Sequence, residues 1–206
     1  MVKTMNETTA EILFTSAVRE IQTKYGSREA MAKLEARGHW TYELTDDVIS
    51  FIRTRDSFYF GTSSCSGRPH IQHRGGPPGF IEVLDNRTLM WPEFNGNRQY
   101  ISAGNLSEND QAFMFLMDYN RPRRIKLWGR ARIIEKGDPM FREINEANYA
   151  ANIERAVCFF IEASDENCRK YLTPRYREET LVEQLQQTRA RLETLEAELA
   201  RIRQLS

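Results

Sequence analysis

Hydrophobic and polar residues follow three different patterns along this chain of 206 residues. In the first, over residues 11–37, apolar residues recur with the period of an amphipathic helix. They are Ile12, Leu13, Ala17, Ile21, Ala30, Met31 and Leu34. Gly26 and Ser27 predict a break between two helices, and Gly38 predicts the end of the second. A further short helix is expected over residues 46–53, because two aspartates in its first turn suit the positive end of a helix.

The middle of the chain, from about residue 57 to residue 163, has the pattern of β-strands. Runs of β-branched and aromatic residues predict strands at residues 58–62, 70–74, 79–84, 88–91, 112–117, 124–135 and 157–161. Turn-forming residues separate these runs, and two helical interruptions are predicted near residues 99–106 and 139–149. Many short strands without a helix between each pair favour an antiparallel barrel.

The end of the chain has the pattern of one long helix. No Gly or Pro occurs after residue 178, and apolar residues recur at alternating steps of four and three, the seam of a coiled coil. The seam positions are Leu181, Leu185, Thr188, Leu192, Leu195, Leu199 and Ile202. The flanking charges favour a parallel two-stranded coil, in which Arg191 faces Glu196 and Glu198 faces Arg203 of the partner. The alternative is an amphipathic helix that packs against its own domain.

The three patterns predict a mainly β protein in three parts. These are an N-terminal helical segment at residues 1–43, an antiparallel split barrel at residues 44–174, and a C-terminal coiled-coil helix at residues 175–206. Hydrophobic residues make up 40% of the chain, enough for a core. Lys and Arg number 29, as do Asp and Glu, so the net charge says nothing about nucleic acid. Nucleic-acid binding is disfavoured because the basic residues alternate along one strand rather than form a broad face.

The cysteines and the N-terminus bear on the compartment. Cys65, Cys158 and Cys168 are odd in number and match no metal or redox spacing, which favours reduced thiols. The first ten residues lack the pattern of a secretory signal, and no apolar run has membrane-spanning length. We therefore expect a soluble cytoplasmic protein without a metal site.

The first candidate site lies at residues 69–79, which read Pro-His-Ile-Gln-His-Arg-Gly-Gly-Pro-Pro-Gly. Strand periodicity places Gln72 and Arg74 on one face and His73 on the other. Gly75 and the glycines after it allow a ligand to approach the main chain. This pattern suits a planar, anionic cofactor.

A second cluster, Asn-Gly-Asn-Arg-Gln-Tyr, follows at residues 95–100. It predicts a turn with Arg98 at the start of a helix. Free backbone N–H groups together with a guanidinium at a helix N-terminus form a phosphate site. The alternative is an ordinary helix entry.

The strand predicted around residues 123–134 alternates between cationic and apolar residues. Arg124, Lys126, Trp128, Arg130 and Arg132 share one face. A solvated outer face explains the last two arginines, but an indole between two cations is costly to leave in water. A planar anionic ligand would use the first three.

Together, these motifs and the segments Gly-Asn-Leu-Ser-Glu-Asn-Asp and Leu-Trp-Gly-Arg-Ala-Arg resemble the FMN-binding split-barrel proteins related to pyridoxamine 5′-phosphate oxidase. The similarity is closest to the subgroup of predicted flavin-nucleotide-binding proteins. It covers residues 44–163, and the N-terminal helices are also similar to that subgroup.

The resemblance implies FMN bound between the two subunits of a homodimer. It implies that the strand before the glycine turn lines the isoalloxazine ring and the ribityl chain, and that the helix entry binds the phosphate. The strand with alternating cations would reach the flavin from the second subunit. The cofactor residues so implied are Gln72, His73, Arg74, Gly75, Asn97, Arg98, Gln99, Arg124, Lys126 and Trp128.

The same resemblance implies a flavin-dependent oxidoreductase with a small-molecule electron donor or acceptor, without naming catalytic residues. The oxidase itself places Tyr, Arg and Ser around its substrate phosphate, and an Arg-x-His near its C-terminus. Residues 135–144 lack the first arrangement and the tail has no histidine, so vitamin B6 oxidation is not expected. The alternatives are a non-catalytic flavin-binding or sensing module and a split barrel that uses deazaflavin or haem.

Overall fold

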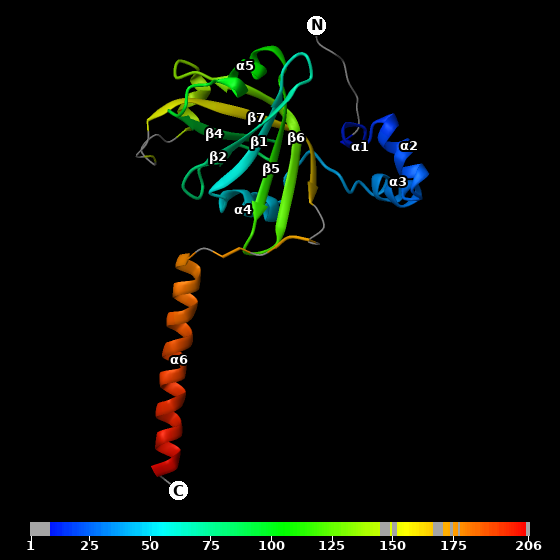
Figure 1. The fold of residues 1–206 in the computed structure, drawn as a ribbon. Coiled ribbons are helices and arrows are strands. Elements are labelled where there is room, and N and C mark those ends of the chain that lie inside the picture. The colour runs from blue at the N-terminus through cyan, green and yellow to red at the C-terminus, as the bar shows by residue number, and fades with distance from the viewer. Residues whose placement is uncertain are drawn as a thin grey trace. The chain divides into compact units, whose positions relative to one another are not determined.

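The computed structural model describes residues 9–144, 149, 152–166, 171–173, 175–176 and 178–204. Figure 1 shows the chain as a ribbon. Its elements, in chain order, are α1 (Thr9–Leu13), α2 (Ser16–Lys24), α3 (Arg28–Ala36), α4 (Asp46–Arg53), β1 (Ser57–Ser63), β2 (Pro69–Gly75), β3 (Glu82–Val83), β4 (Thr88–Phe94), α5 (Ile101–Glu108), β5 (Gln111–Asp118), β6 (Arg123–Ile134), the 3₁₀-helix η1 (Pro139–Glu143), β7 (Ile153–Glu166) and α6 (Glu178–Gln204).

Contacts divide the chain into two units, and each is described by itself. The first unit comprises residues 1–117 and 124–168 and contains the helices α1–α5 and nearly all of the sheet. The second comprises residues 118–123 and 169–206 and contains α6. None of the helices in the described part of the chain has the length and apolar character needed to cross a membrane.

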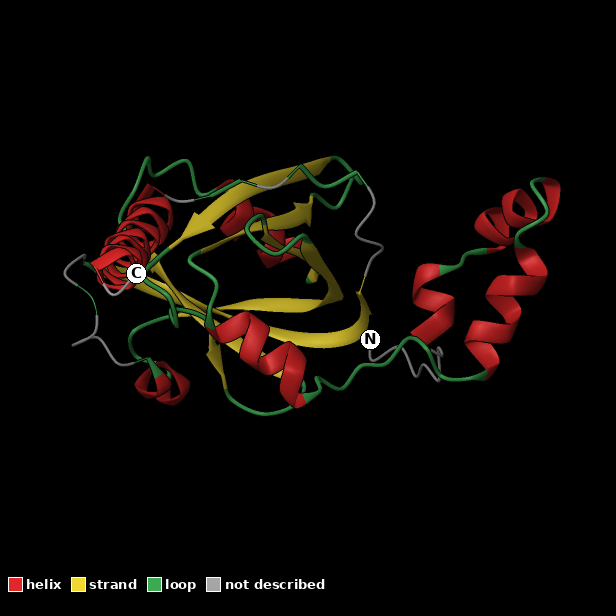
Figure 2. Ribbon diagram, turned by 90° about the horizontal axis from the view of Figure 1, so that it is seen from below, coloured by secondary structure: helices red, strands yellow, loops and turns green. Residues whose placement is uncertain are grey.

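The strands form one seven-stranded sheet in the order β2-β1-β5-β6-β7-β4-β3. The pairs β1–β2, β1–β5, β6–β7, β4–β7 and β3–β4 are antiparallel. Figure 2 shows the strands curving around an interior. The two end strands, β2 and β3, do not pair with each other among the described residues, so the barrel is open. The predicted mainly β fold with a split barrel is confirmed.

Alternate residues of the strands fill the interior of the barrel. Trp91 is fully buried, and its ring centroid lies 5.0 Å from that of Phe58 and 5.0 Å from that of Phe60. Other buried members of this core include Met114, Leu116, Ile125, Leu127, Val157, Phe159 and Ile161. A slip of one residue in any strand would turn these side chains out of the core, so their burial fixes the register.

The predicted strand at residues 79–84 is wrong for most of its length, because β3 contains only Glu82 and Val83. Phe80 and Ile81 are each 1% exposed, although a strand on a half-buried sheet points successive residues to opposite sides. The backbone N–H of Phe80 donates to the carbonyl of Pro77 at 3.0 Å, which closes a turn. The turn brings both side chains into the core. The other strands lie where predicted, although β7 extends well beyond residues 157–161 at both ends.

The helices predicted at residues 46–53 and 99–106 are confirmed as α4 and α5, whereas the prediction for the N-terminal region needs correction. Helix α4 has the predicted bounds, and the Thr45 hydroxyl accepts from the N–H of Val48. The N-terminal helical region breaks twice rather than once, since Thr15 caps the start of α2 by accepting from Val18. Helix α5 starts two residues later than predicted. The interruption predicted at 139–149 contains the 3₁₀-helix η1, while residues 145–148 lie outside the described part.

A second, smaller core lies under η1. It is formed by Met90, Ile134, Phe141, Ile144, Ile153, Ala156 and Cys158. Ile134 has the same parity on its strand as the exposed Arg132, and η1 explains why it is nevertheless buried. Of the cysteines, Cys158 is buried and Cys65 is exposed, and Cys168 lies outside the described residues.

Candidate functional site

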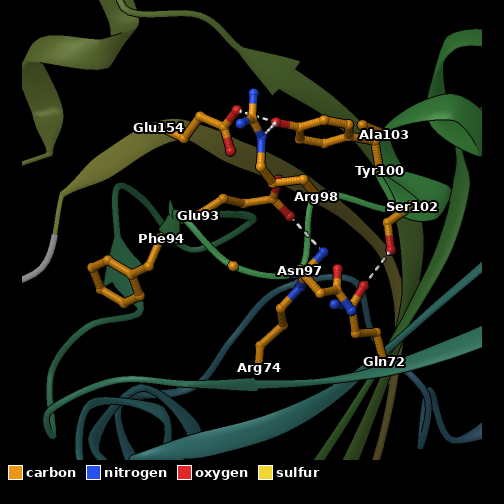
Figure 3. Close-up of a pocket in the computed structure, with 11 residues that line it drawn as sticks. Gln72, Arg74, Glu93, Phe94, Asn97, Arg98, Tyr100, Ser102, Ala103 and Glu154 are labelled. Atoms are coloured by element: carbon orange, nitrogen blue, oxygen red, sulfur yellow. Dashed lines mark hydrogen bonds and ion pairs between the residues drawn. The ribbon is translucent and has the colours of Figure 1, made fainter.

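A polar pocket of about 170 Å³ lies where β2, β4, the start of β7 and the residues that lead into α5 come together. We call it the α5 pocket, and Figure 3 shows its side chains. Its lining residues are Gln72, Arg74, Glu93, Phe94, Gly96, Asn97, Arg98, Tyr100, Ser102, Ala103 and Glu154. The pocket thus joins the two motifs that the sequence separates by about twenty residues.

Strand alternation places Gln72, Arg74 and Glu93 of the α5 pocket on the inner side of the sheet. Arg74 pairs with Phe58 and Gln72 pairs with Phe60, and paired residues of antiparallel strands point to the same face. Glu93 follows the buried Trp91 by two positions on β4 and therefore also points inward. The pocket is the polar end of the barrel interior, next to the edge strand β2.

Arg74 and Glu93 form the ion pair at the base of the α5 pocket. The Arg74 Nη2 atom lies 2.5 Å from Glu93 Oε1, and the two side chains are only 17% and 10% exposed. Burial lowers the pKa of the Arg74 guanidinium, and the charge of Glu93 opposes that shift. The Nε atom of Arg74 is buried and has no hydrogen-bond partner among the described residues. A buried, unpaired N–H of this kind suits an anionic ligand.

The loop before α5 has an unusual backbone. Arg98 and Tyr100 have φ values of 58° and 54°, in the left-handed region that residues with a Cβ rarely adopt. The Asn97 Oδ1 atom accepts from the N–H of Gln99 at 3.2 Å and helps to hold this turn. Strained backbone of this kind persists where surrounding contacts fix it, and it is concentrated at functional sites.

The N-terminus of α5 faces the same pocket. Tyr100 occupies the N-cap position, but no described side chain caps the helix there. The first helical hydrogen bond runs from Gly104 to Tyr100, so the N–H groups before Gly104 have no partner inside the helix. Ser102 and Ala103 line the pocket, and the Ser102 hydroxyl donates to Gln72 Oε1 at 3.2 Å. An uncapped helix N-terminus attracts an anion.

Tyr100 also ties the loop to β7. Its hydroxyl donates to Glu154 Oε1 at 2.6 Å, and Arg98 Nε donates to the same hydroxyl at 3.3 Å. The Arg155 guanidinium lies 2.8 Å from Glu154 Oε1 and 4.7 Å from the Tyr100 ring centroid. The hydrogen bond from Tyr100 lowers the pKa of Glu154, and the same hydroxyl raises the pKa of Arg98. Arg98 lines the pocket, and Figure 3 shows its side chain directed towards Glu154 and the Tyr100 hydroxyl.

A second candidate surface lies on the outer face of the sheet, and we call it the β6 shelf. The Trp128 ring packs 5.0 Å from that of Phe113, and Lys126 Nζ lies 5.6 Å from the Trp128 ring. Lys126 also pairs with Asp165 at 3.2 Å. The Nε atom of Arg124 is buried and finds no hydrogen-bond partner in the described structure. A shallow hollow of mostly apolar lining lies beside Trp128 and Phe113.

The structure brings four of the ten predicted residues together in the α5 pocket, namely Gln72, Arg74, Asn97 and Arg98. His73 lies on the opposite face of β2, where its ring contacts Tyr59 at 5.7 Å. Gly75 ends β2, and Gln99 is exposed outside the lining. Arg124, Lys126 and Trp128 lie on the β6 shelf. The sheet therefore separates the two groups within one chain.

Sequence reasoning missed Glu93, Tyr100 and Glu154. Tyr100 stands in the second motif and its position could have been found there. Glu93 has the inward parity of Trp91, but only the fold shows that it meets Arg74. Arg130 pairs with Asp110 and Glu162 at 2.8 Å each, as expected for the solvated end of its strand.

Comparison with known families identifies the fold. A family model described as pyridoxamine 5′-phosphate oxidase matches residues 44–204 of this chain. The chain belongs to the pyridoxamine 5′-phosphate oxidase family. The match includes all ten site residues predicted from the sequence and nearly all of α6. No curated protein gives a comparable match.

Solved structures with this family's fold resemble the chain. HupZ from Group A Streptococcus is 16% identical to it, with 65% of this chain and 99% of that chain covered and a TM-score of 0.50. An FMN-binding protein from Syntrophomonas wolfei is 13% identical, with coverages of 71% and 97% and a TM-score of 0.42. HutZ from Vibrio cholerae, described as a haem storage protein, is 16% identical, with coverages of 58% and 91% and a TM-score of 0.40. At such identities the similarity concerns the fold alone.

Proposed function

We propose that this chain binds FMN, with the phosphate in the α5 pocket, and that it is an FMN-dependent oxidoreductase acting on a small molecule. The observation that carries the proposal is that Arg74, with its buried and unpaired Nε, lines the same pocket as the uncapped N-terminus of α5. Both are donors without partners among the described residues, and both suit a phosphate dianion. Arg98, which also lines the pocket, adds a third donor and a second cation.

The size of the α5 pocket supports a site for the phosphate end of FMN and not for the whole molecule. Its volume of about 170 Å³ is below the roughly 300–1,000 Å³ of sites that enclose a whole small molecule. It has room for the phosphate end, with Gln72 and Asn97 as hydrogen-bonding groups beside it. The flat ring system would then lie outside the pocket and need another surface.

The β6 shelf of a second copy is the surface that we propose for the ring. Trp128 and Phe113 offer an apolar contact, and Lys126 and Arg124 offer positive charge. These groups lie on the other face of the sheet from the pocket of their own chain. A homodimer that places the shelf of one subunit beside the pocket of the other would complete each site.

FMN, when bound, supplies electron and hydride transfer, and the protein binds and orients it. Arg74 and Arg98 would hold the phosphate, while Lys126 would favour the reduced, anionic form of the ring. We assign no acid or base among the side chains of the chain.

The test of FMN binding uses the full chain and its visible spectrum. The purified protein is expected to show flavin absorption, either as isolated or after incubation with FMN. Arg98→Ala should weaken FMN binding by about 10- to 150-fold, because a charge-assisted hydrogen bond contributes about 1.5–3 kcal/mol. Arg68→Ala removes an exposed arginine from the β1–β2 turn, outside the pocket, and is expected to change nothing. Equal affinities of the two variants, or a haem spectrum without flavin, would contradict the proposal.

A second experiment separates an enzyme from a binding or sensing module. Rapid bleaching of the bound flavin by NADH or NADPH, followed by reoxidation with an added acceptor, would support the oxidoreductase. A flavin that binds tightly but resists reduction by both would support a module without turnover. In that case the exposed seam of α6 would be the natural output surface.

A further inference from the structure

Helix α6 carries an apolar seam, defined as Leu181, Leu185, Thr188, Leu192, Leu195, Leu199 and Ile202. Its apolar members are between 38% and 69% exposed. The helix is 27 residues long, about 40 Å, so the seam is a continuous stripe rather than scattered surface residues. A stripe of this length indicates a contact surface.

The geometry of the seam fits another helix better than a sheet. Its members recur at alternating steps of four and three, which gives the narrow stripe of a coiled coil. A helix that packs against a globular core has a wider apolar face. The flanking positions are Val182, Gln184, Arg189, Arg191, Glu196, Glu198 and Arg203, of which only Val182 is apolar. Against a broad apolar surface, the charged residues at these flanking positions would lie against apolar groups.

We propose that α6 pairs with α6 of a second copy of this chain, in parallel and in register. With Leu185 at heptad position a, Arg191 of one helix faces Glu196 of the other, and Glu198 faces Arg203. Two-fold symmetry repeats both contacts. The charges beside the seam of one α6 are therefore complementary to those of a second, parallel α6. This pairing does not depend on FMN binding.

Thr188 decides the orientation. An antiparallel pair with full overlap would also match charges, since Arg189 would face Glu196 and Arg191 would face Glu198. It would, however, place each Thr188 against Leu199. The parallel pair places Thr188 against Thr188 and keeps all other seam layers apolar. A single polar seam residue of this kind specifies register and orientation.

Disulfide crosslinking in the full-length protein tests the proposal. In a background with Cys65→Ser and Cys168→Ser, Leu185→Cys is expected to form a crosslinked dimer under mild oxidation. Ala197→Cys, on the side of α6 opposite the seam, serves as the matched control and should remain largely uncrosslinked. Adding Leu192→Glu to the Leu185→Cys variant should abolish the crosslink, whereas adding Ala190→Glu on the outer side should not.

Each other outcome overturns part of the proposal. If Leu185→Cys alone stays monomeric but Leu185→Cys with Ile202→Cys crosslinks, the helices pair antiparallel. If neither crosslinks and the amides of α6 are protected from hydrogen exchange independently of protein concentration, the seam packs within its own chain. If the amides exchange freely at all concentrations, α6 has no partner. Whether these variants bind FMN is a separate measurement, and its result bears only on the cofactor proposal.

Discussion

At the scale of single residues, Glu93 is the side chain that we expect to limit the affinity of the α5 pocket for a phosphate. The pocket holds the carboxylates of Glu93 and Glu154 as well as the guanidinium groups of Arg74 and Arg98. A phosphate entering it would compete with Glu93 for Arg74, and the two anions would repel each other. Glu93 also lies 3.9 Å from Arg155 Nε. Without a ligand, it therefore neutralises Arg74, whose charge would otherwise be buried without a charged partner, which is strongly destabilising.

Replacing Glu93 is expected to trade stability for affinity. Glu93→Gln should lower the melting temperature of the unliganded protein, because Arg74 loses its charged partner. It should also tighten FMN binding about tenfold, equivalent to about 1.4 kcal/mol, because the competing anion is gone. Thermal unfolding with and without FMN, together with fluorescence titration, measures both effects.

Glu143→Gln is the control, because Glu143 is exposed on η1, outside the α5 pocket. It is expected to alter neither stability nor affinity. Weaker FMN binding by Glu93→Gln would mean that Glu93 positions the ligand rather than competes with it.

At the scale of elements, the contact between Tyr100 and Glu154 joins the entry of α5 to β7. The Tyr100 hydrogen bond lowers the pKa of Glu154 below its ordinary value of 4.5. The stabilisation from this contact is therefore fully present above about pH 4.5 and is lost as the pH falls through the lowered pKa. The position of the Arg98 side chain should depend on the same contact, because its Nε donates to the Tyr100 hydroxyl.

Tyr100→Phe is expected to reduce this acid sensitivity, because only the nearby arginines would then lower the pKa of Glu154. The melting temperature of the variant should lie below that of the parent above about pH 5, and the difference should shrink towards about pH 3. Tyr25→Phe, at an exposed tyrosine outside the pocket, should follow the parent at every pH. A constant difference between parent and Tyr100→Phe at all pH values would show that Glu154 is not the group involved.

Strand β6 depends on a glycine at its irregular point. The register with β7 shifts between Trp128 and Gly129. A Cβ on Gly129 would lie 2.0 Å from the Phe160 carbonyl oxygen, a backbone atom that cannot move aside alone. The shift determines which residues of β7 lie opposite Trp128 and the β6 residues before it.

Gly129→Ala is expected to destabilise the fold by about 3 kcal/mol or more, because the two strands must separate. Gly137→Ala, where a Cβ would meet nothing within 4 Å, should change stability by no more than about 0.5 kcal/mol. Denaturant unfolding of both variants measures the contrast. Similar stabilities would mean that β7 adapts without cost.

At the scale of the whole molecule, the homodimer proposed above would build each FMN site from two subunits. The α5 pocket and the β6 shelf lie on opposite faces of the sheet in one chain. Two defective variants should therefore complement each other. Arg98→Ala damages the pocket, and Trp128→Ala damages the shelf.

Mixing these variants after dissociation and reassociation should restore about a quarter of the FMN sites, since half of the dimers are mixed and each has one intact site. Titration with FMN before and after mixing measures the recovery, and mixing each variant with itself is the control. No recovery despite proven subunit exchange would place each site within a single chain, while leaving FMN binding itself untouched.

The sequence predicted the parts of the fold that depend on neighbouring residues. The two faces of β2 were predicted because side chains of any strand alternate, and Gln72 and Arg74 do share the inner face. The bounds of α4 were predicted because Thr45 and the aspartates after it form a local start signal. The helical course of α6 was predicted for similar reasons, while its pairing stays a prediction.

The sequence alone did not determine which distant residues contact each other. In the sequence, Phe80 and Ile81 have the pattern of a strand. In the structure, the turn at Pro77 places both side chains in the core. Glu93 looks like an ordinary strand carboxylate until β2 and β4 converge and bring it to Arg74. Alternation and capping are properties of a few adjacent residues, so sequence alone determines them. Contacts between distant strands depend on how all the side chains pack together, so only the tertiary structure decides them.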